Sequence, residues 1–240
     1  NLFLFRLVHL FACYPETLIL EFAGRTDRKH ARLRHTFSSM DAVTVCTRVR
    51  FDPDCFGIST IFSYSIKSNI NEFQLRGALD AFHHDGSWHS VCVSWNQSGG
   101  RWALFTHGQF VSEGEGLSSS SIGPDGLFII GQEQDTFGGS FKKNESFSGS
   151  ITELYIWDRV LNASEMKSME KECSPISSGL VFKWNASAME IETTLTKESK
   201  KNICCEFISD TTRYALDIWT SSVQICFRNW QLVIAVSGLN

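Results

Sequence analysis

The chain has 240 residues, of which 42% are hydrophobic and 20% are charged, and its formal net charge at pH 7 is −4. This composition predicts one large globular domain, or one domain with an extension, and argues against disorder across the body of the chain. The small negative net charge excludes the electrostatic pattern of a nucleic-acid-binding protein. The one basic stretch, residues 25–34, also contains Asp27 and is expected to form a solvated loop.

The first residues of the chain leave two interpretations open. Residues 2–13 are apolar but are interrupted by Arg6 and His9, so they form either the end of a secretory signal or a first edge strand. Neither this stretch nor any other is long and apolar enough to span a bilayer. We expect no membrane-spanning segment here, in a chain that is either a secreted protein or the ectodomain part of a membrane protein.

Residues 18–160 have the pattern of an antiparallel β-sandwich, with short strands separated by clusters of Gly, Asn, Asp and Ser. Around Cys46 and around Cys92, the aliphatic residues share one parity and the cysteine takes the other. Each cysteine should therefore point away from the aliphatic face of its strand. Four tryptophans recur in this region and are expected to pack in the core or on the sheets: Trp88, Trp95, Trp102 and Trp157.

One short helix is predicted after the strand region. Asn162 and Glu165 have the spacing of a capping box, and the helix should run to about Glu172. Met166 and Met169 fall on one face of this helix and should be buried against a sheet.

Cysteines and glycosylation sequons predict a location outside the cell. The chain has eight cysteines, which suit an oxidising compartment better than the cytosol. Asn-x-Ser sequons occur four times, at Asn96, Asn144, Asn162 and Asn185. We therefore expect an extracellular or cell-surface glycoprotein. At Asn162 the glycan competes with the predicted cap, so one of these two expectations should fail.

Residues 127–141 contain the strongest signal for a metal site. The apolar run 127–130 is followed by Glu133, Gln134 and Asp135, and then by a pair of glycines. On an extended backbone, Glu133 and Asp135 point the same way while Gln134 offers its backbone oxygen. Calcium takes about six to eight oxygen ligands of these kinds. On spacing alone, a solvated turn with incidental acids is an equal alternative.

Four segments in this order resemble the pentraxin family. Residues 131–141 resemble its calcium loop, and the strands around the two cysteines and the segment after the loop agree with it: residues 42–49, 90–95 and 149–161. The resemblance implies an all-β fold, a two-sheet antiparallel jelly-roll sandwich of the pentraxin, laminin-G and concanavalin type with one short helix. Together with the strand parity it also implies a disulfide between Cys46 and Cys92.

The resemblance divides the chain into three parts. Residues 1–17 are an N-terminal segment, residues 18–185 are the pentraxin-like domain, and residues 186–240 are a C-terminal extension or linker of unknown fold. The pairing of the other six cysteines stays open: Cys13, Cys55, Cys173, Cys204, Cys205 and Cys226.

The family's calcium ligands are only partly retained. Asn71 keeps one ligand position, but Ile70 stands where the family has Asp, Lys142 where it has Glu, and Glu145 where it has Gln. The first site would then use Asn71, Glu133, the Gln134 carbonyl and Asp135, and the second would keep Glu133, Asp135 and Glu145. Because the Lys142 ammonium repels a divalent ion, we expect one weakly held calcium and no second ion.

The resemblance implies an extracellular calcium-binding recognition module, not an enzyme. The sequons, the C-terminal extension and Ser90, which replaces the family's histidine, favour the ligand- or matrix-sensing N-terminal domain of an adhesion G-protein-coupled receptor. Expected partners are an extracellular protein, matrix or glycan ligand, and a homodimer is favoured over a pentamer.

Two alternatives stay open. The first is another binding protein, a secreted soluble pentraxin for pattern recognition, and the second, from a different class, is a glycan-processing enzyme on the same fold. The sequence shows no pairing of a nucleophile with a base. The segment 83–85, His-His-Asp, lies near His89 and suggests zinc, but a solvated turn is favoured.

Overall fold

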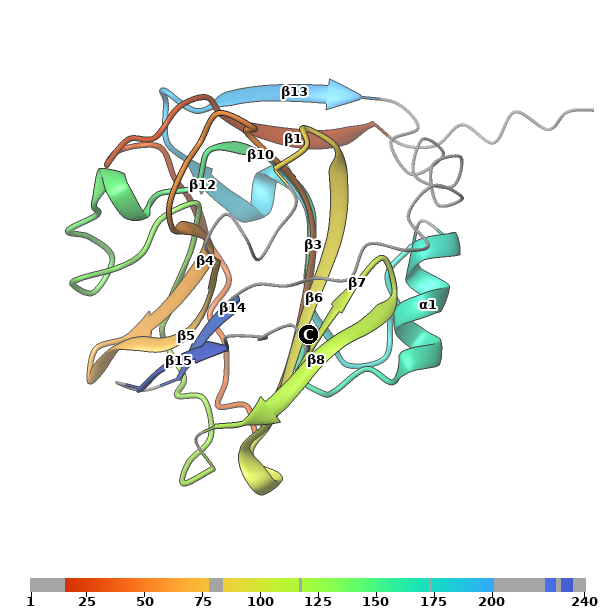
Figure 1. The fold of residues 1–240 in the computed structure, drawn as a ribbon. Helices are drawn as coiled ribbons and strands as arrows, with labels where there is room; N and C mark the ends of the chain where they lie inside the picture. The colour runs from red at the N-terminus through yellow and green to blue at the C-terminus, as the bar shows by residue number, and fades with distance from the viewer. Residues whose placement is uncertain are drawn as a thin grey trace, which may run out of the picture.

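The structure is a computed structural model that describes residues 16–77, 84–116, 118–172 and 174–200, together with 223–227 and 230–234. Residues 171–172, 223–227 and 230–234 are described by their backbone only. Two antiparallel sheets pack face to face, and one helix lies on the outer side of one of them (Figure 1). The predicted all-β sandwich with one short helix is confirmed.

The sheet that carries the helix, sheet A, has eight strands. Their order is β13 (Thr196–Lys200), β1 (Thr17–Phe22), β10 (Gly149–Trp157), β3 (Ala42–Phe51), β6 (Trp88–Asn96), β7 (Arg101–Thr106) and β8 (Gln109–Glu115), and β11 (Leu180–Lys183) also pairs with β10. The opposing sheet B has seven strands. Their order is β12 (Met189–Ile191), β2 (Ala31–Leu33), β9 (Leu127–Ile130), β4 (Ser59–Ile66), β5 (Asn69–Gly77), β14 (Val223–Phe227) and β15 (Trp230–Ile234).

Residues beyond the expected boundary at 185 take part in both sheets. β12 pairs with β2 in sheet B, and β13 pairs along β1 in sheet A. β14 and β15 also pair in sheet B, next to β5, so strands of the sandwich come from well beyond residue 185, while residues 1–15 lie outside the described part of the chain.

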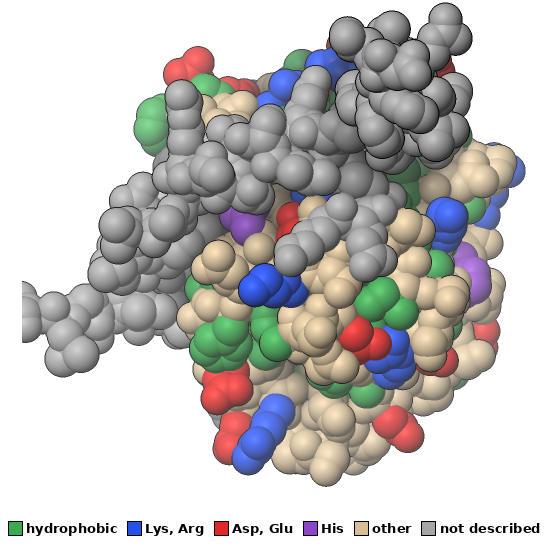
Figure 2. All heavy atoms as spheres, turned by 90° about the vertical axis from the view of Figure 1, so that its right-hand side faces the viewer, with side chains coloured by type: hydrophobic (Ala, Val, Ile, Leu, Met, Phe, Trp, Pro, Cys, Tyr) green, Lys and Arg blue, Asp and Glu red, His purple; other side chains and the backbone are tan. Residues whose placement is uncertain are grey.

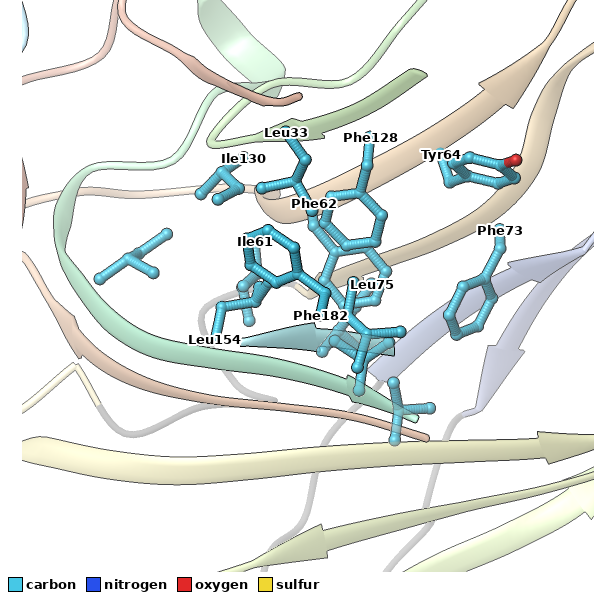
Figure 3. Packing of buried hydrophobic residues seen from close by; sticks show 14 of the residues in the cluster. Leu33, Ile61, Phe62, Tyr64, Phe73, Leu75, Phe128, Ile130, Leu154 and Phe182 are labelled. Atoms are coloured by element: carbon cyan, nitrogen blue, oxygen red, sulfur yellow. The ribbon is translucent and has the colours of Figure 1, made fainter. Parts of the chain in front are cut away.

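The core lies between the sheets and follows the two-residue period of the strands. Phe73 and Leu75 of β5 and Phe128 and Ile130 of β9 point inward from sheet B, and Leu154 of β10 is among the residues that meet them (Figure 3). Burying a side chain of this size stabilises the fold by about 1.5–3 kcal/mol.

The tryptophans pack as predicted. Trp95 and Trp102 belong to the core between the sheets, and Trp157 is buried under the helix. Trp88 is half-buried and lies under the Arg50 guanidinium, whose carbon is 5.1 Å from the centre of the indole ring. The interpretation of these side chains as core and sheet packing is confirmed.

The helix α1 (Ala163–Glu172) covers the outer face of sheet A. Its first turn is closed by the predicted capping box, in which the Asn162 N–H donates to Glu165 Oε2 at 2.8 Å and the Glu165 N–H donates to Asn162 Oδ1 at 3.0 Å. Met166 and Met169 are buried against the cysteine pair of the sheet, as predicted. Asn162 is exposed, and its side chain caps the helix through Oδ1. The cap therefore does not use Nδ2, the atom to which a glycan would be attached, so the two expectations for Asn162 are compatible.

The hairpin between β7 and β8 rests on α1. Its two turn residues have positive φ, 49° at His107 and 69° at Gly108, which is the geometry of a two-residue hairpin turn. A Cβ on Gly108 would lie 3.1 Å from Lys167 Cα and 3.2 Å from the Met166 carbonyl oxygen. Only glycine therefore allows the turn to approach the helix this closely.

The expected solvated loop at residues 25–34 is wrong for its first residue and for β2, whose Ala31 and Leu33 are buried in sheet B. The Arg25 guanidinium donates to Cys55 Sγ at 2.7 Å and to the backbone oxygens of Ile58 at 2.5 Å and Asn144 at 2.6 Å. Arg25 thus links the loop that contains Ile58 to the loop that contains Asn144.

On the side of the molecule that carries α1, acidic and basic side chains are intermixed, as the small net charge predicts (Figure 2).

Candidate metal centre

The predicted metal loop leaves sheet B at the end of β9. Gly131 has a φ of +86°, and a Cβ there would lie 2.2 Å from Phe22 Cε1, so the chain can turn only at a glycine. The Phe147 N–H donates to the Gly131 carbonyl at 3.0 Å and closes the base of the loop. Residues 131–147 therefore begin and end at one point on the sheet.

The Gln134 side chain anchors this loop. It is fully buried, its Oε1 accepts from Ser65 Oγ at 2.6 Å and from the Gly138 N–H at 2.9 Å, and its Nε2 donates to Ser63 and to the Leu127 carbonyl at 3.1 Å. The amide is used up by these bonds, so only the backbone oxygen of Gln134 is left as a ligand. Sequence reasoning predicted a backbone ligand here but missed the anchoring role.

The loop then reverses and brings a third carboxylate back. The N–H of Gly139 donates to the Thr136 carbonyl at 3.0 Å, and the short 3-10 turn Lys143–Glu145 follows. One carboxylate oxygen each of Glu133, Asp135 and Glu145 lies within 4.8 Å of the others. The structure thus gathers the three acidic side chains that the sequence singled out.

Apart from ion pairs, three buried oxygens of this group form no hydrogen bond: Oε2 of Glu133, Oδ2 of Asp135 and Oε2 of Glu145. Asp135 Oδ2 forms an ion pair with Lys142 Nζ at 2.8 Å, so Oε2 of Glu133, a residue that is 5% exposed, and Oε2 of Glu145 are left without a partner at hydrogen-bonding distance. Burial and the neighbouring Asp135 carboxylate raise the pKa of Glu133 to about 7. The cluster therefore attracts a cation, because such oxygens are costly to bury unpaired.

Two protein cations already face the cluster. Lys142 Nζ lies 2.8 Å from Asp135 Oδ2 and 4.0 Å from Glu145 Oε2, and the hydrogen bond to Asp135 raises the pKa of the ammonium. Arg76 Nη2, on β5, donates to Glu145 Oε1 at 2.8 Å, and the Arg76 side chain is 5% exposed. The cluster thus combines three carboxylates with two cations.

Asn71, the remaining predicted ligand, lies at the start of β5. Its Oδ1 accepts from Gln74 Nε2 at 3.1 Å, and Gln74 Oε1 is buried without a hydrogen-bond partner. Sequence reasoning missed Gln74 and Arg76. The signal for both is parity, because Phe73 and Leu75 fill the core and their neighbours in β5 must face outward, toward the loop.

The residues present fit one calcium ion. The orphaned oxygens of Glu133 and Glu145 are hard donors of the type calcium takes, and Asp135 and the Gln134 carbonyl stand beside them in sequence. Lys142 opposes a second ion at the same carboxylates. Calcium binding by these residues stays a prediction.

The cysteine prediction is confirmed for one pair. Cys46 and Cys92 are joined by a disulfide between directly opposed residues of β3 and β6. Among the described side chains Cys55 is free and buried. The other five cysteines lie outside the side chains that the structure describes.

The four sequon asparagines lie in different surroundings. Asn144, Asn162 and Asn185 are exposed, whereas Asn96 is half-buried with its Oδ1 accepting from the Ser98 N–H at 2.8 Å. Glycosylation at all four stays a prediction.

The expected solvated turn is present at Asp85 and Gly86, which are exposed, but the histidines beside it are not solvated. His84 stacks on Phe51 with ring centres 4.7 Å apart. His89 is buried, its Nε2 lies 3.0 Å from Asp85 Oδ1, and its Nδ1 lies 3.2 Å from Nε2 of His107. His83 lies outside the described residues. The histidine pair was missed because its members are 18 residues apart.

Comparison with known proteins places this fold and loop in one family. The model of the Pentaxin family matches residues 77–198. Human adhesion G protein-coupled receptor D2 is 32% identical over 215 residues, which is 81% of this chain and 22% of the receptor. Human neuronal pentraxin-2 is 32% identical over 186 residues, 71% of this chain and 43% of that protein. The chain therefore spans less than half the length of these relatives.

Solved structures agree on the fold. The native heptameric SAP-like pentraxin from Limulus polyphemus superposes with a TM-score of 0.67 at 24% identity, covering 79% of this chain and 97% of that one. The full extracellular region of zebrafish Gpr126/Adgrg6 gives a TM-score of 0.61 at 15% identity, covering 77% of this chain and 26% of that one. In the described part of the chain, no helix has the length and apolar character needed to cross a membrane.

These relatives confirm the extracellular location predicted from the cysteines and sequons, and the likeness to adhesion-receptor domains. The two-sheet fold, the loop after β9 and the matched family model agree with one another. The chain belongs to the pentraxin (Pentaxin) family.

Proposed function

We propose that this chain is an extracellular calcium-binding recognition domain, and that it is the ligand- or matrix-sensing N-terminal part of an adhesion G-protein-coupled receptor. The observation that carries the calcium proposal is the convergence of Glu133, Asp135 and Glu145 with two buried oxygens left unpaired. The similarity to adhesion G protein-coupled receptor D2 over 81% of the chain supports the receptor context. The proposed role is binding without catalysis.

One calcium ion at this place would join parts of the chain that are distant in sequence. Glu133, Asp135 and the Gln134 carbonyl come from the start of the loop, Glu145 from its end, and Asn71 from β5. When bound, the ion supplies positive charge and free coordination positions for an anionic or hydroxyl-bearing ligand. The loop, anchored by Gln134, presents these positions to an extracellular protein, matrix or glycan partner.

Thermal unfolding of the secreted chain, with calcium titrated against excess chelator, tests the calcium proposal. A ligand that binds only the folded state stabilises it by about 2.7 kcal/mol at a hundredfold excess over Kd. We expect a saturable rise in Tm that Asp135→Ala abolishes and that Glu113→Gln, on the exposed edge strand β8, leaves intact. An equal calcium response in both variants, or no response up to millimolar calcium, contradicts the proposal.

A secreted soluble pentraxin is the second candidate, favoured by the 32% identity to human neuronal pentraxin-2 over 71% of the chain. The two candidates differ in assembly. A receptor domain should be a monomer or a dimer and prefer a protein partner, whereas a soluble pentraxin should form a larger ring. The mass of the purified glycosylated chain in solution, measured with and without calcium, separates them.

A further inference from the structure

The ammonium of Lys142 lies inside the charge cluster of the proposed calcium loop. Its Nζ is 2.8 Å from Asp135 Oδ2 and 4.0 Å from Glu145 Oε2, yet the side chain is 55% exposed. A lysine stem is flexible and carries a compact charge, so this ammonium can leave the cluster without disturbing the core. The loop therefore contains its own removable cation.

Arg76 holds the far side of the same cluster and is not removable in this way. Its side chain is 5% exposed, and its Nη2 binds Glu145 Oε1 at 2.8 Å. Because one oxygen of Glu145 is fixed by Arg76, the other, Oε2, is left facing Lys142 and the remaining carboxylates. Arg76 is thus a positioning residue, and Lys142 is the exchangeable partner.

The charges of the cluster explain why a cation is needed there. Three carboxylates with oxygens within 4.8 Å of one another repel strongly unless positive charge lies among them. Asp135 precedes the turn at residues 136–139 and Glu145 follows it, so an unscreened cluster would push the two arms of the loop apart. Lys142 bridges these arms in the ion-free protein.

We propose that Lys142 is a tethered cation that holds the loop closed in the absence of metal, and that calcium enters by displacing this ammonium from Asp135. The second half of this inference rests on the proposed calcium function, whereas the first half does not. Two consequences follow. The loop stays ordered without calcium, and calcium binds more weakly than the carboxylates alone would allow, because it must replace an existing ion pair.

Lys142→Gln tests both halves, and Lys143→Gln is the matched control. Lys143 is the next residue and is also exposed, and its side chain makes none of the ion pairs of the cluster. In excess chelator, Lys142→Gln should lower Tm by roughly 2–4 °C and speed proteolytic cleavage between residues 136 and 146. With calcium, the same variant should bind the ion about tenfold more tightly, because ligand charge sets affinity in such sites.

The control should match the wild-type chain in every measurement. If Lys142→Gln is as stable and as protease-resistant as the control in chelator, and its calcium Kd is unchanged, the tethered-cation inference is wrong. If Lys142→Gln loses stability in chelator but no variant responds to calcium, the inference holds for the ion-free loop and the proposed calcium function fails. A tighter calcium Kd in Lys142→Gln alone supports both.

Arg76→Gln gives an independent check on the positioning role. This variant frees Glu145 while leaving Lys142 in place, so calcium affinity should fall several-fold and the benefit of Lys142→Gln should be lost in the double variant. If the two substitutions are additive in calcium affinity, Arg76 does not position Glu145. Circular dichroism of the chelated variant confirms that the sandwich is intact.

Discussion

Two groups of buried and half-buried acidic side chains lie on opposite outer faces of the sandwich, and they differ in how their oxygens are used. Beside sheet B, Glu133, Asp135 and Glu145 converge, and oxygens of Glu133 and Glu145 are left without a hydrogen-bond partner. Under α1, Glu153 and Glu170 share Arg48, at 2.8 Å and 3.2 Å. Neither of these two carboxylates leaves a buried oxygen unpaired in the described part of the chain.

This difference marks the group beside sheet B as a candidate metal site and the group under α1 as a structural ion-pair network. A β-bulge in β10 turns Glu153, at φ 53°, toward Arg48, and Arg48 links the sheet to α1 through Glu170. The guanidinium binds both acids there, so the group lacks the unpaired buried oxygens that a metal ion would use. In the loop beside sheet B, oxygens of Glu133 and Glu145 are buried without a hydrogen-bond partner, and these oxygens are what a metal ion can use.

Removing the shared cation should give the largest effect. Arg48 is 6% exposed as a side chain, and Arg48→Ala leaves Glu153 and Glu170 buried without a partner. Breaking a buried ion pair in this way costs about 3–5 kcal/mol. Urea unfolding should therefore show a strong loss that does not depend on calcium. Arg50→Ala, in a pair whose arginine is 33% exposed, is the control and should cost far less.

Neutralising one acid in each group should separate them by the sign of the effect. In chelator, Glu133→Gln should hold or raise Tm because it removes a poorly solvated carboxyl, and it should abolish the calcium-induced gain of about 2.7 kcal/mol at a hundredfold excess over Kd. Glu153→Gln should lower stability by about 1–3 kcal/mol and keep the calcium response. If the two variants change stability and the calcium response equally, the distinction between the metal site and the ion-pair network is wrong.

The local periodicities made most of the sandwich predictable. Strand parity placed Cys46 and Cys92 on the face away from the aliphatic residues, which is the face that α1 covers, and the capping box gave the start of α1, because both depend on residues that are near in sequence. The sequence pattern did not show β12 and β13, which pair in the sheets after residue 185, because they are short edge strands whose pairing is decided by distant partners. Short, solvent-facing edges carry little alternation that a sequence pattern can detect.

The candidate site was predictable only along the loop itself. Glu133 and Asp135 were found by their spacing together with the family resemblance of residues 131–141, whereas Arg76 reaches Glu145 from β5, more than 50 residues earlier. The His89–His107 pair was missed for the same reason, since it joins β6 to a hairpin turn. Contacts between strands depend on register, and a single sequence does not fix register.

Acid pH should weaken the helix side of the sandwich. Burial and the adjacent His89 lower the pKa of His107, which also faces Glu170 of α1, Arg48 of β3 and Asp85. Because the unfolded chain binds a proton more readily than His107 does in the fold, stability is lost as pH falls below about 6.5. Tm measured from pH 8 to pH 5 should fall, and His107→Asn should flatten this slope. A slope that is unchanged in the variant contradicts the assignment.

The smallest expected effect concerns the N-terminal end of α1, where the cap residue Asn162 also belongs to a sequon. Asn162→Ala removes the cap acceptor and should cost about 1 kcal/mol. Ser164→Ala destroys the same sequon while keeping the Asn162 Oδ1 bond to Glu165, so it isolates the glycan from the cap. If Asn162 carries a glycan, both variants should lose the same mass, and only Asn162→Ala should lose stability in unfolding measurements. Equal stability losses would mean that the glycan, not the cap, stabilises this end of the helix. A loss of mass in neither variant would mean that the exposed Asn162 serves only as a cap.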